Sequence, residues 1–198
     1  METIQQYILL NWKELTAAFF GLIYVLLAAR QNVLCWFSGI INVVIYAWIF
    51  YDQRIYANMT LQIIYLIISI YGIYSWIKKK KGRTAEIKLL DNSYRYFILV
   101  LFIILIGIIY LALENKDSNM IMFDAATTAA GIIATWMQAR KFIENWLVWI
   151  PTDIILTIMF ITQELYVTAG LFAIYTFLAI YAYLKWKKVL KTKLVTIA

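Results

Sequence analysis

Two stretches of this chain, ARQNVLCWFSGIINVVIYAWIF at 29–50 and ARKFIENWLVWIPTDIILTIMF at 139–160, lie 110 residues apart and match at several positions. Both begin with Ala-Arg, place a tryptophan seven residues after that alanine and end in phenylalanine. The match extends from position 21 to position 78, where 17 of 58 residues are identical to those 110 positions later. An aliphatic composition raises such a count, but matched Trp, Arg, Gly and Tyr are rarer coincidences. The chain therefore contains an internal repeat.

The composition is too apolar for a water-soluble fold. Of the 198 residues, 64% are hydrophobic and 15% are charged, whereas soluble domains are roughly 45–50% apolar and about 25% charged. Long apolar runs and a single proline favour transmembrane helices over a barrel, whose strands alternate polar and apolar residues. We therefore predict an all-α integral membrane protein with one transmembrane domain over residues 1–198.

A membrane-crossing helix needs about 20 mostly apolar residues. Seven stretches qualify: 15–32, 33–51, 55–77, 96–113, 121–139, 143–161 and 166–186. Because the repeat offset equals four spans, both copies cross the membrane in the same direction. The predicted plan is 3+1+3, with parallel repeats at 15–78 and 121–188 and a lipid-facing linker helix at 96–113. Parallel repeats are a transporter design, with the substrate site near the membrane midplane between the copies.

The net charge of +7 comes from basic residues at the ends of the apolar runs. Fifteen of the 18 lysines and arginines fall on one side of the predicted topology, which leaves Lys13, Arg54 and Lys116 on the other. The positive-inside rule then predicts an outer N-terminus and a cytoplasmic C-terminus. The run KKKKGRTAEIKLLDNSYR (78–95) becomes a cytoplasmic loop that needs no role beyond topology, and ENKDSN (114–119) becomes an outer loop. This placement predicts contact with lipid headgroups and not with nucleic acid.

The chain has no histidine and one cysteine, Cys35. Histidine and cysteine are the usual protein ligands of haem, zinc and copper, so we expect no cofactor and no metal site. Cys35 lies in a hydrophobic run and is expected to be a small packing residue.

Polar side chains at membrane depth are candidate functional residues, because an ionisable group in hydrocarbon is energetically costly. In the sixth span, Trp146, Trp149 and Asp153 are spaced i, i+3, i+7 and share one helical face. Two indoles and a carboxylate suit a planar, positively charged heteroaromatic ligand through stacking and cation–π attraction. The further candidates for this site are Asn145, Gln138, Asn42, Tyr46, Asn58, Gln62 and Asp124.

Several of these residues also have a structural interpretation. Trp146 is shallow enough to belong to an interfacial aromatic belt. Asp153 could be protonated and hydrogen-bonded between helices. Asp124 could be a solvated helix start near the outer surface, and Asn58 and Gln62 could cross-link helices.

The segment DAATTAAGIIATWMQARKFIENWLVWIPTD (124–153) contains a specific motif, Trp-Met-Gln-Ala-Arg-Lys followed by Glu-Asn-Trp-x-x-Trp. With this motif and the 3+1+3 plan, the chain resembles the PnuC family of vitamin transporters over essentially its full length. The resemblance implies a SWEET-like transporter fold in the bacterial inner membrane. It also implies uptake of an unphosphorylated vitamin by facilitated diffusion, with trapping by a cytoplasmic kinase. The substrate contacts that it implies are Trp146, Trp149, Asn145, Gln138, Asn42 and Trp36.

The resemblance leaves two substrates open, because nicotinamide riboside carries a pyridinium and thiamine a thiazolium. The ribose would need further amide and hydroxyl partners, which Asn42, Asn58, Gln62 and Thr135 can supply. This favours nicotinamide riboside. A monomer is expected to suffice, because the chain already contains both copies of the repeat.

Three other functions fit less well. A retinal photoreceptor needs a lysine buried in the last span, where this chain has Lys185 only at the cytoplasmic end. An intramembrane aspartyl enzyme would need Asp124 and Asp153 to share a proton, but their expected depths differ by about 10–15 Å of helix. A purely structural membrane subunit would not require a vitamin site.

Overall fold

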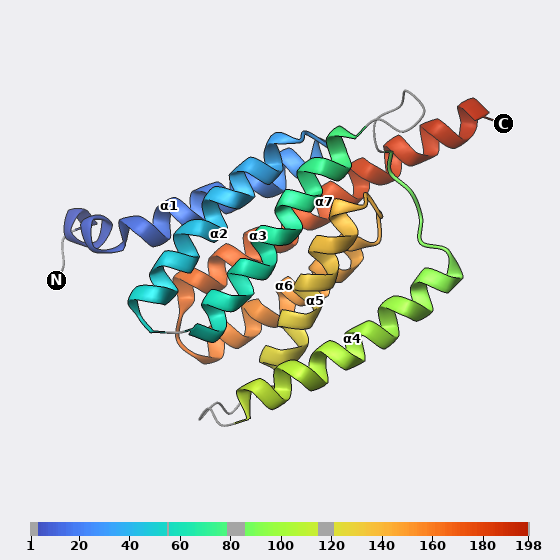
Figure 1. Ribbon diagram of the computed structural model, residues 1–198. Helices are drawn as coiled ribbons and strands as arrows, with labels where there is room; N and C mark the ends of the chain where they lie inside the picture. The colour runs from blue at the N-terminus through green and yellow to red at the C-terminus, as the bar shows by residue number, and fades with distance from the viewer. Residues whose placement is uncertain (1–3, 55, 79–85, 115–120, 198) are drawn as a thin grey trace.

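A computed structural model of the chain describes residues 4–54, 56–78, 86–114 and 121–197, and seven α-helices make up most of these ranges (Figure 1). The helices are α1 (Ile4–Ala29), α2 (Leu34–Asp52), α3 (Tyr56–Ile77), α4 (Asn92–Leu113), α5 (Ile121–Ala139), α6 (Asn145–Thr162) and α7 (Tyr166–Ile197). All seven predicted spans are confirmed as helices, and α1 and α7 extend furthest beyond the predicted bounds. Most of the stretches KKKKGR and ENKDSN lies outside the described residues.

Length and composition mark six of the described helices as able to cross a membrane, and α5 is the one left out. α5 is rich in alanine and threonine, and 11 of its 19 residues are buried. Small side chains let neighbouring helices approach closely in a membrane protein. At 1.5 Å per residue α5 is about 28 Å long, close to the hydrocarbon thickness. Its lower hydropathy therefore reflects its central position in the bundle.

The helix contacts follow the predicted 3+1+3 order. α2 packs between α1 and α3, and α6 packs between α5 and α7 in the same way. The two groups meet where α1 contacts α7 and where α3 contacts α5. α4 contacts only α5 among the described helices, has no buried residue and lies at the edge of the bundle (Figure 1). The repeat bounds 15–78 and 121–188 stay predictions.

Individual contacts between the two groups recur at the 110-residue offset. The Trp76 indole N–H donates to the Gln138 carbonyl at 3.2 Å, and the Trp186 indole N–H donates to the Ala28 carbonyl at 3.1 Å. Both the donors and the acceptors lie 110 residues apart. Each bond joins the third helix of one copy to the first helix of the other, so the two bonds are related by pseudo-twofold symmetry.

The turns between the helices repeat as well. Gln31 and Lys141 have φ values of 56° and 57°, and Arg54 and Glu164 have values of 59° and 60°. Helices commonly end at such a left-handed residue, which reverses the chain direction within a few residues. Equivalent helices of the two copies therefore end in the same backbone conformation.

Four tryptophans form the core at the end of the bundle that carries the α5–α6 loop. Trp36 packs edge-to-face on Trp76 at 5.5 Å, and Trp146 packs edge-to-face on Trp186 at 5.6 Å between ring centroids. Such pairs add about 0.5–1.5 kcal/mol beyond the burial of their area. Cys35 is buried in the same cluster as a free thiol, as its apolar surroundings predict.

Gly72 tests how tightly this core is packed. A Cβ at Gly72 in α3 would overlap the Trp36 indole, whereas a Cβ at Gly107 in α4 would meet no atom within 4 Å. We expect Gly72→Ala to lower the free energy of unfolding by about 1–3 kcal/mol, the usual cost of overpacking. Gly107→Ala is the matched control and should leave stability unchanged or raise it by up to about 1 kcal/mol, because alanine favours a helix more than glycine does. Thermal unfolding in detergent measures both, and equal transitions for the two variants would contradict the prediction.

Candidate functional site

α6 distributes the predicted site residues along its length. Asn145 and Trp146 lie in its first turn, and Asp153 follows eight residues after Asn145, about 12 Å along the helix axis. These three side chains are 0%, 2% and 4% exposed, and Trp149 between them is half-buried. The candidate site therefore extends along α6 from the α5–α6 loop toward the middle of the bundle.

The level next to the loop contains two buried amides. Gln138 at the end of α5 is fully buried, and neither its Nε2 nor its Oε1 has a hydrogen-bond partner among the described residues. Asn145 is also fully buried, and its Nδ2 donates to the Phe142 carbonyl at 2.6 Å while its Oδ1 has no partner. Most buried polar side-chain atoms in folded proteins are hydrogen-bonded. Two unsatisfied amides at neighbouring helix ends mark a place where a polar ligand can complete the bonding.

The first copy contributes polar atoms at this same level. The Tyr24 ring packs edge-to-face on Trp36 at 5.8 Å, and its hydroxyl lies beside the Gln138 side chain without a hydrogen bond of good geometry. The indole nitrogens of Trp36 and Trp146 are buried and have no partner among the described residues. Polar atoms from both copies are thus available where the copies meet.

The deeper level combines aromatic rings with glycines. A Cβ at Gly131 in α5 would overlap the Tyr65 hydroxyl of α3 and touch the Trp149 ring. The equivalent Gly21 in α1 lies in the same way against the Tyr175 hydroxyl of α7. Glycine is needed at these two positions because the tyrosine of the opposite copy occupies the space of a side chain.

Asp153 is the acidic group of this deeper level. It is buried, and no described side chain donates a hydrogen bond to its carboxylate. Its electrostatic neighbour is Tyr175, which also lies near Tyr46. α2, α3, α5 and α6 contain no lysine or arginine, Lys13 of α1 is paired with Asp52, and the first lysine of α7 is Lys185, ten residues after Tyr175. A cation that enters this region would therefore be the natural partner of the carboxylate.

Some predicted residues have other surroundings. The Asn42 side-chain amide lies beside Gly21 of the deeper level, and it donates to the Ala17 carbonyl at 2.7 Å, which joins α2 to α1. Asn58 is exposed near the start of α3, and Gln62 is half-buried one turn later. The described contacts do not bring either of them to the buried amides. Asp124 lies in the first turn of α5, at the opposite end of that helix from Gln138.

Sequence reasoning missed three tyrosines, Tyr24, Tyr65 and Tyr175. Tyr65 and Tyr175 are identical at the repeat offset, as are the glycines that they contact. The identity of both the tyrosines and the glycines at the 110-residue offset could have indicated these two residues. Tyr24 has no such signal, because its counterpart is Ala134.

Residues 11–188 match the family described as nicotinamide mononucleotide transporter. This chain belongs to that family. It is similar to the nicotinamide riboside transporter PnuC of Escherichia coli K12, with 25% identity over 184 aligned residues that cover 79% of this chain and 77% of that protein. It is also similar to the nicotinamide riboside transporter PnuC of Neisseria mucosa, with 24% identity over 152 residues that cover 73% of this chain and 58% of that protein.

The fold is also similar to the crystal structure of the vitamin B3 transporter PnuC. The TM-score is 0.72, and the match covers 92% of this chain and 83% of the solved chain at 18% identity. Family membership makes the protein a membrane transporter, and it removes the intramembrane enzyme and the structural subunit from the alternatives.

The unsatisfied amide of Gln138 is expected to lower the stability of the ligand-free protein, although it serves to bind the ligand. A buried polar group without a partner costs about 1–3 kcal/mol, so Gln138→Leu should raise the thermal unfolding temperature of the ligand-free protein. Thr135→Val is the control, because the Thr135 hydroxyl already donates to the Gly131 carbonyl at 2.7 Å. It should not raise that temperature. A Gln138→Leu protein less stable than wild type would mean that the amide is satisfied.

Proposed function

We propose that this transporter carries nicotinamide riboside, an unphosphorylated pyridinium nucleoside, across the bacterial inner membrane by facilitated diffusion. The observation that carries the proposal is the pair of buried, unsatisfied amides of Gln138 and Asn145, on the same side of the bundle as Trp149 and Asp153. An aromatic ring that bears a carboxamide and a positive charge is complementary to all four groups.

The carboxamide is the feature that favours nicotinamide riboside over thiamine. A carboxamide has one acceptor oxygen and two N–H donors, and Gln138 offers both kinds of partner while Asn145 offers a free acceptor oxygen. Thiamine has no carboxamide, and its hydrogen-bonding groups lie on an aminopyrimidine ring separate from the charged thiazolium. Nicotinamide riboside instead carries the carboxamide and the positive charge on one ring, so that a single ring can meet the amides, Trp149 and Asp153.

The indoles have different roles in this proposal. Trp146 is buried and packed edge-to-face on Trp186 in the core, and its indole N–H, which has no partner among the described residues, is the group that it offers to the ligand. Trp149 is half-buried next to Gly131 and can stack on the pyridinium. Cation–π contacts with tryptophan contribute up to about 2 kcal/mol when desolvated. The Asp153 carboxylate then balances the positive charge of the ring.

The charges of the bundle favour the riboside over the mononucleotide. A phosphate ester needs basic partners, typically bidentate arginine. The helices α2, α3, α5 and α6 contain none. Arg140 and Lys141 lie outside them: Arg140 packs over the rings of Tyr94, Trp136 and Phe142, and the Lys141 ammonium lies over the Trp76 ring. A phosphorylated ligand would instead bring its negative charge toward Asp153.

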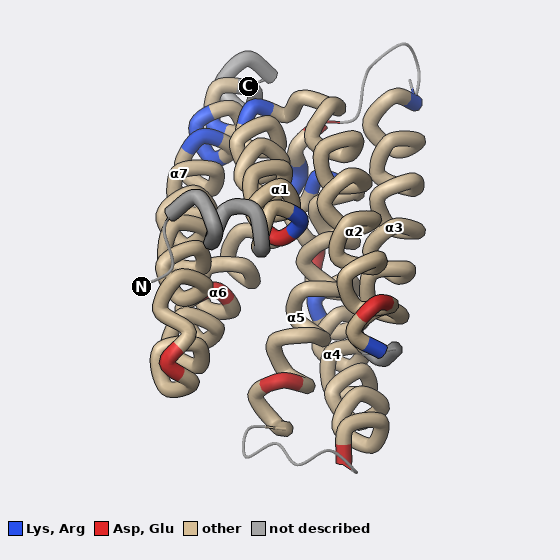
Figure 2. The backbone as a smooth tube through the Cα atoms, turned by 90° about the vertical axis from the view of Figure 1, so that its left-hand side faces the viewer, with Lys and Arg blue, Asp and Glu red and all other residues tan. Residues whose placement is uncertain are grey.

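The orientation and the partners belong to the same proposal. The lysines of α7 lie at one end of the bundle, and acidic segments of α4 and α5 lie at the other (Figure 2). The positive-inside rule then favours a cytoplasmic C-terminus and an outer N-terminus. A cytoplasmic kinase would trap the substrate after release. A monomer suffices, because both copies contribute to the site.

Ligand binding to the purified protein tests the substrate. We expect calorimetry to give a lower Kd for nicotinamide riboside than for thiamine or nicotinamide mononucleotide. Trp149→Ala should raise that Kd by about 10- to 30-fold, because about 2 kcal/mol of cation–π energy is lost. Asp153→Asn should also raise it. Trp12→Ala is the control, because Trp12 is 51% exposed in α1 and should leave the Kd unchanged.

Two outcomes would contradict the substrate assignment. Tighter binding of thiamine would mean that the free amides do not recognise a carboxamide. Tighter binding of the mononucleotide would mean that a phosphate site exists outside the helices considered above.

Uptake into liposomes tests the transport mode. In liposomes held at zero membrane potential, facilitated diffusion predicts that internal nicotinamide riboside, which is a cation, rises to the external concentration and no further. An imposed pH or sodium gradient should leave that endpoint unchanged, because a passive carrier does not couple to ion flow. Protein-free liposomes are the control. Accumulation driven by a proton gradient would refute passive transport and would make Asp153 the candidate proton carrier.

A further inference from the structure

The described part of the loop between α3 and α4 is held against the α5–α6 loop. We call residues 86–91 the strap. Its Lys88 N–H donates to the Lys141 carbonyl at 3.0 Å, and the Ile143 N–H donates to the Lys88 carbonyl at 3.1 Å. These two bonds form an isolated parallel β-bridge between Lys88 and Phe142. This part of the loop therefore does more than connect two helices.

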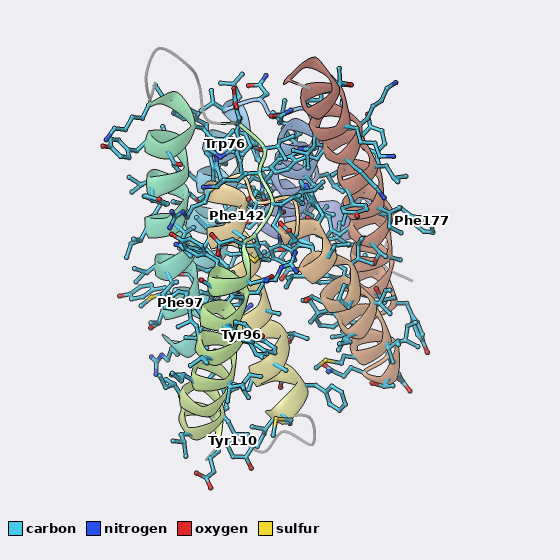
Figure 3. All side chains as sticks on the ribbon, turned by 90° about the vertical axis from the view of Figure 1, so that its right-hand side faces the viewer. Trp76, Tyr96, Phe97, Tyr110, Phe142 and Phe177 are labelled. Atoms are coloured by element: carbon cyan, nitrogen blue, oxygen red, sulfur yellow. The ribbon has the colours of Figure 1, made fainter. Side chains whose placement is uncertain are left out.

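Side chains fix the strap on both sides of the α5–α6 loop. Ile87 is buried in the core cluster of the four tryptophans, and Leu90 is buried in a second cluster with Met137 and Phe142. The Lys88 ammonium lies 4.4 Å from the centre of the Phe142 ring. Trp76 and Phe142 mark the region where the strap crosses on its way to α4 (Figure 3).

Charge interactions accompany this packing. The Lys141 ammonium lies 4.5 Å from the centre of the Trp76 ring. Burial lowers the pKa of Lys141, and the nearby Glu86 carboxylate of the strap acts in the opposite direction. The strap therefore supplies a counter-charge to a buried lysine of the loop.

The first copy shows that the loop does not need a strap in order to fold. Asn32 N–H bonds to the Leu27 carbonyl at 3.0 Å, as the Phe142 N–H bonds to the Met137 carbonyl at 3.0 Å. The backbone N–H of Trp36 bonds to the Val33 carbonyl at 3.1 Å, as the backbone N–H of Trp146 bonds to the Ile143 carbonyl at 3.2 Å. Among the described residues, no segment pairs with residues 30–34 as the strap pairs with the second loop.

The end of the strap bonds to Glu144, the residue next to the buried amide of Asn145. The Leu90 N–H donates to Glu144 Oε1 at 3.0 Å, and Glu144 directly precedes Asn145. Phe142, which the strap covers, provides the carbonyl that holds the Asn145 Nδ2. The equivalents of Glu144 and Asn145 in the first copy are Leu34 and Cys35, which cannot serve in this way.

We propose that the strap is a positioning element of the substrate site, and that Glu144 is the positioning residue through which it acts. The bond from the Leu90 N–H to Glu144 fixes the position of the first turn of α6. The Asn145 Oδ1 and the Trp146 indole N–H then face the ligand. In this proposal Glu144 acts through Oε1, which accepts from Leu90; its Oε2 is buried without a partner among the described residues, and a direct contact of that oxygen with the ligand is the alternative that the changes in the strap test. This proposal rests on the proposed function, because its effect is read through nicotinamide riboside.

Calorimetric binding of nicotinamide riboside to the purified full-length protein tests the positioning role. Glu144→Ala removes the acceptor and Leu90→Pro removes the donor of the same bond. Each should raise the Kd about tenfold, which is the value of one hydrogen bond, and the double variant should raise it no further. Glu144→Gln keeps an acceptor oxygen and should stay within about threefold of wild type. Leu34→Ala, the equivalent change in the first copy, is the control without effect.

Selectivity separates positioning from a general loss of structure. The preference for nicotinamide riboside over pyridinium riboside, which lacks the carboxamide, should fall in Glu144→Ala by the same factor as the affinity. A merely structural defect would weaken both ligands equally and would overturn the proposal. If Leu90→Pro does not fold, the pair Ile87→Ala and Leu90→Ala weakens the docking of the strap and should also raise the Kd.

Two results distinguish failure of this proposal from failure of the proposed function. If wild type does not bind nicotinamide riboside, the proposed function fails. Suppose that wild type binds and that Glu144→Ala weakens binding, while Leu90→Pro and the pair Ile87→Ala with Leu90→Ala leave the Kd unchanged. Glu144 then contacts the ligand itself, and the positioning role is wrong.

Discussion

The two reciprocal hydrogen bonds between the copies are the interaction on which the rest of the structure depends. Trp76 bonds to the Gln138 carbonyl and Trp186 bonds to the Ala28 carbonyl, and each spans from a third helix to a first helix. Both donor indoles are buried, so bulk water does not compete for these two bonds. These bonds place the end of α5 against α3, and this contact positions Gln138 at the boundary between the copies.

The proposed site is asymmetric although its frame is symmetric. Gln138, Asn145 and Asp153 have Ala28, Cys35 and Val43 as their counterparts in the first copy. The second copy therefore carries the amides and the carboxylate, and the first copy supplies aromatic walls. Such a division suits a ligand that has no twofold symmetry. The strap adds a further asymmetry, since it covers the loop of the second copy alone among the described residues.

Much of the fold could be predicted from the sequence, because lipid imposes simple rules on helix length and polarity. The site could be predicted only in part. Asn42 stays a predicted ligand contact: its amide lies beside Gly21, and its bond to the Ala17 carbonyl, which joins α2 to α1, could not be predicted. Tyr24 was not a candidate, yet its hydroxyl lies beside Gln138. Such differences arise because the partner of a polar side chain depends on the facing helix, which periodicity within one span does not identify.

The sequence by itself determined that the chain is a membrane protein of seven helices built from two parallel copies, and its motif indicated a vitamin transporter. The physical reason is that apolar length, charge at span ends and a fixed repeat offset are all local or periodic properties. Only the tertiary structure decided which polar atoms lack partners, since this depends on contacts between α1, α3, α5 and α6. It also decided that the strap, expected to serve topology alone, pairs with the α5–α6 loop.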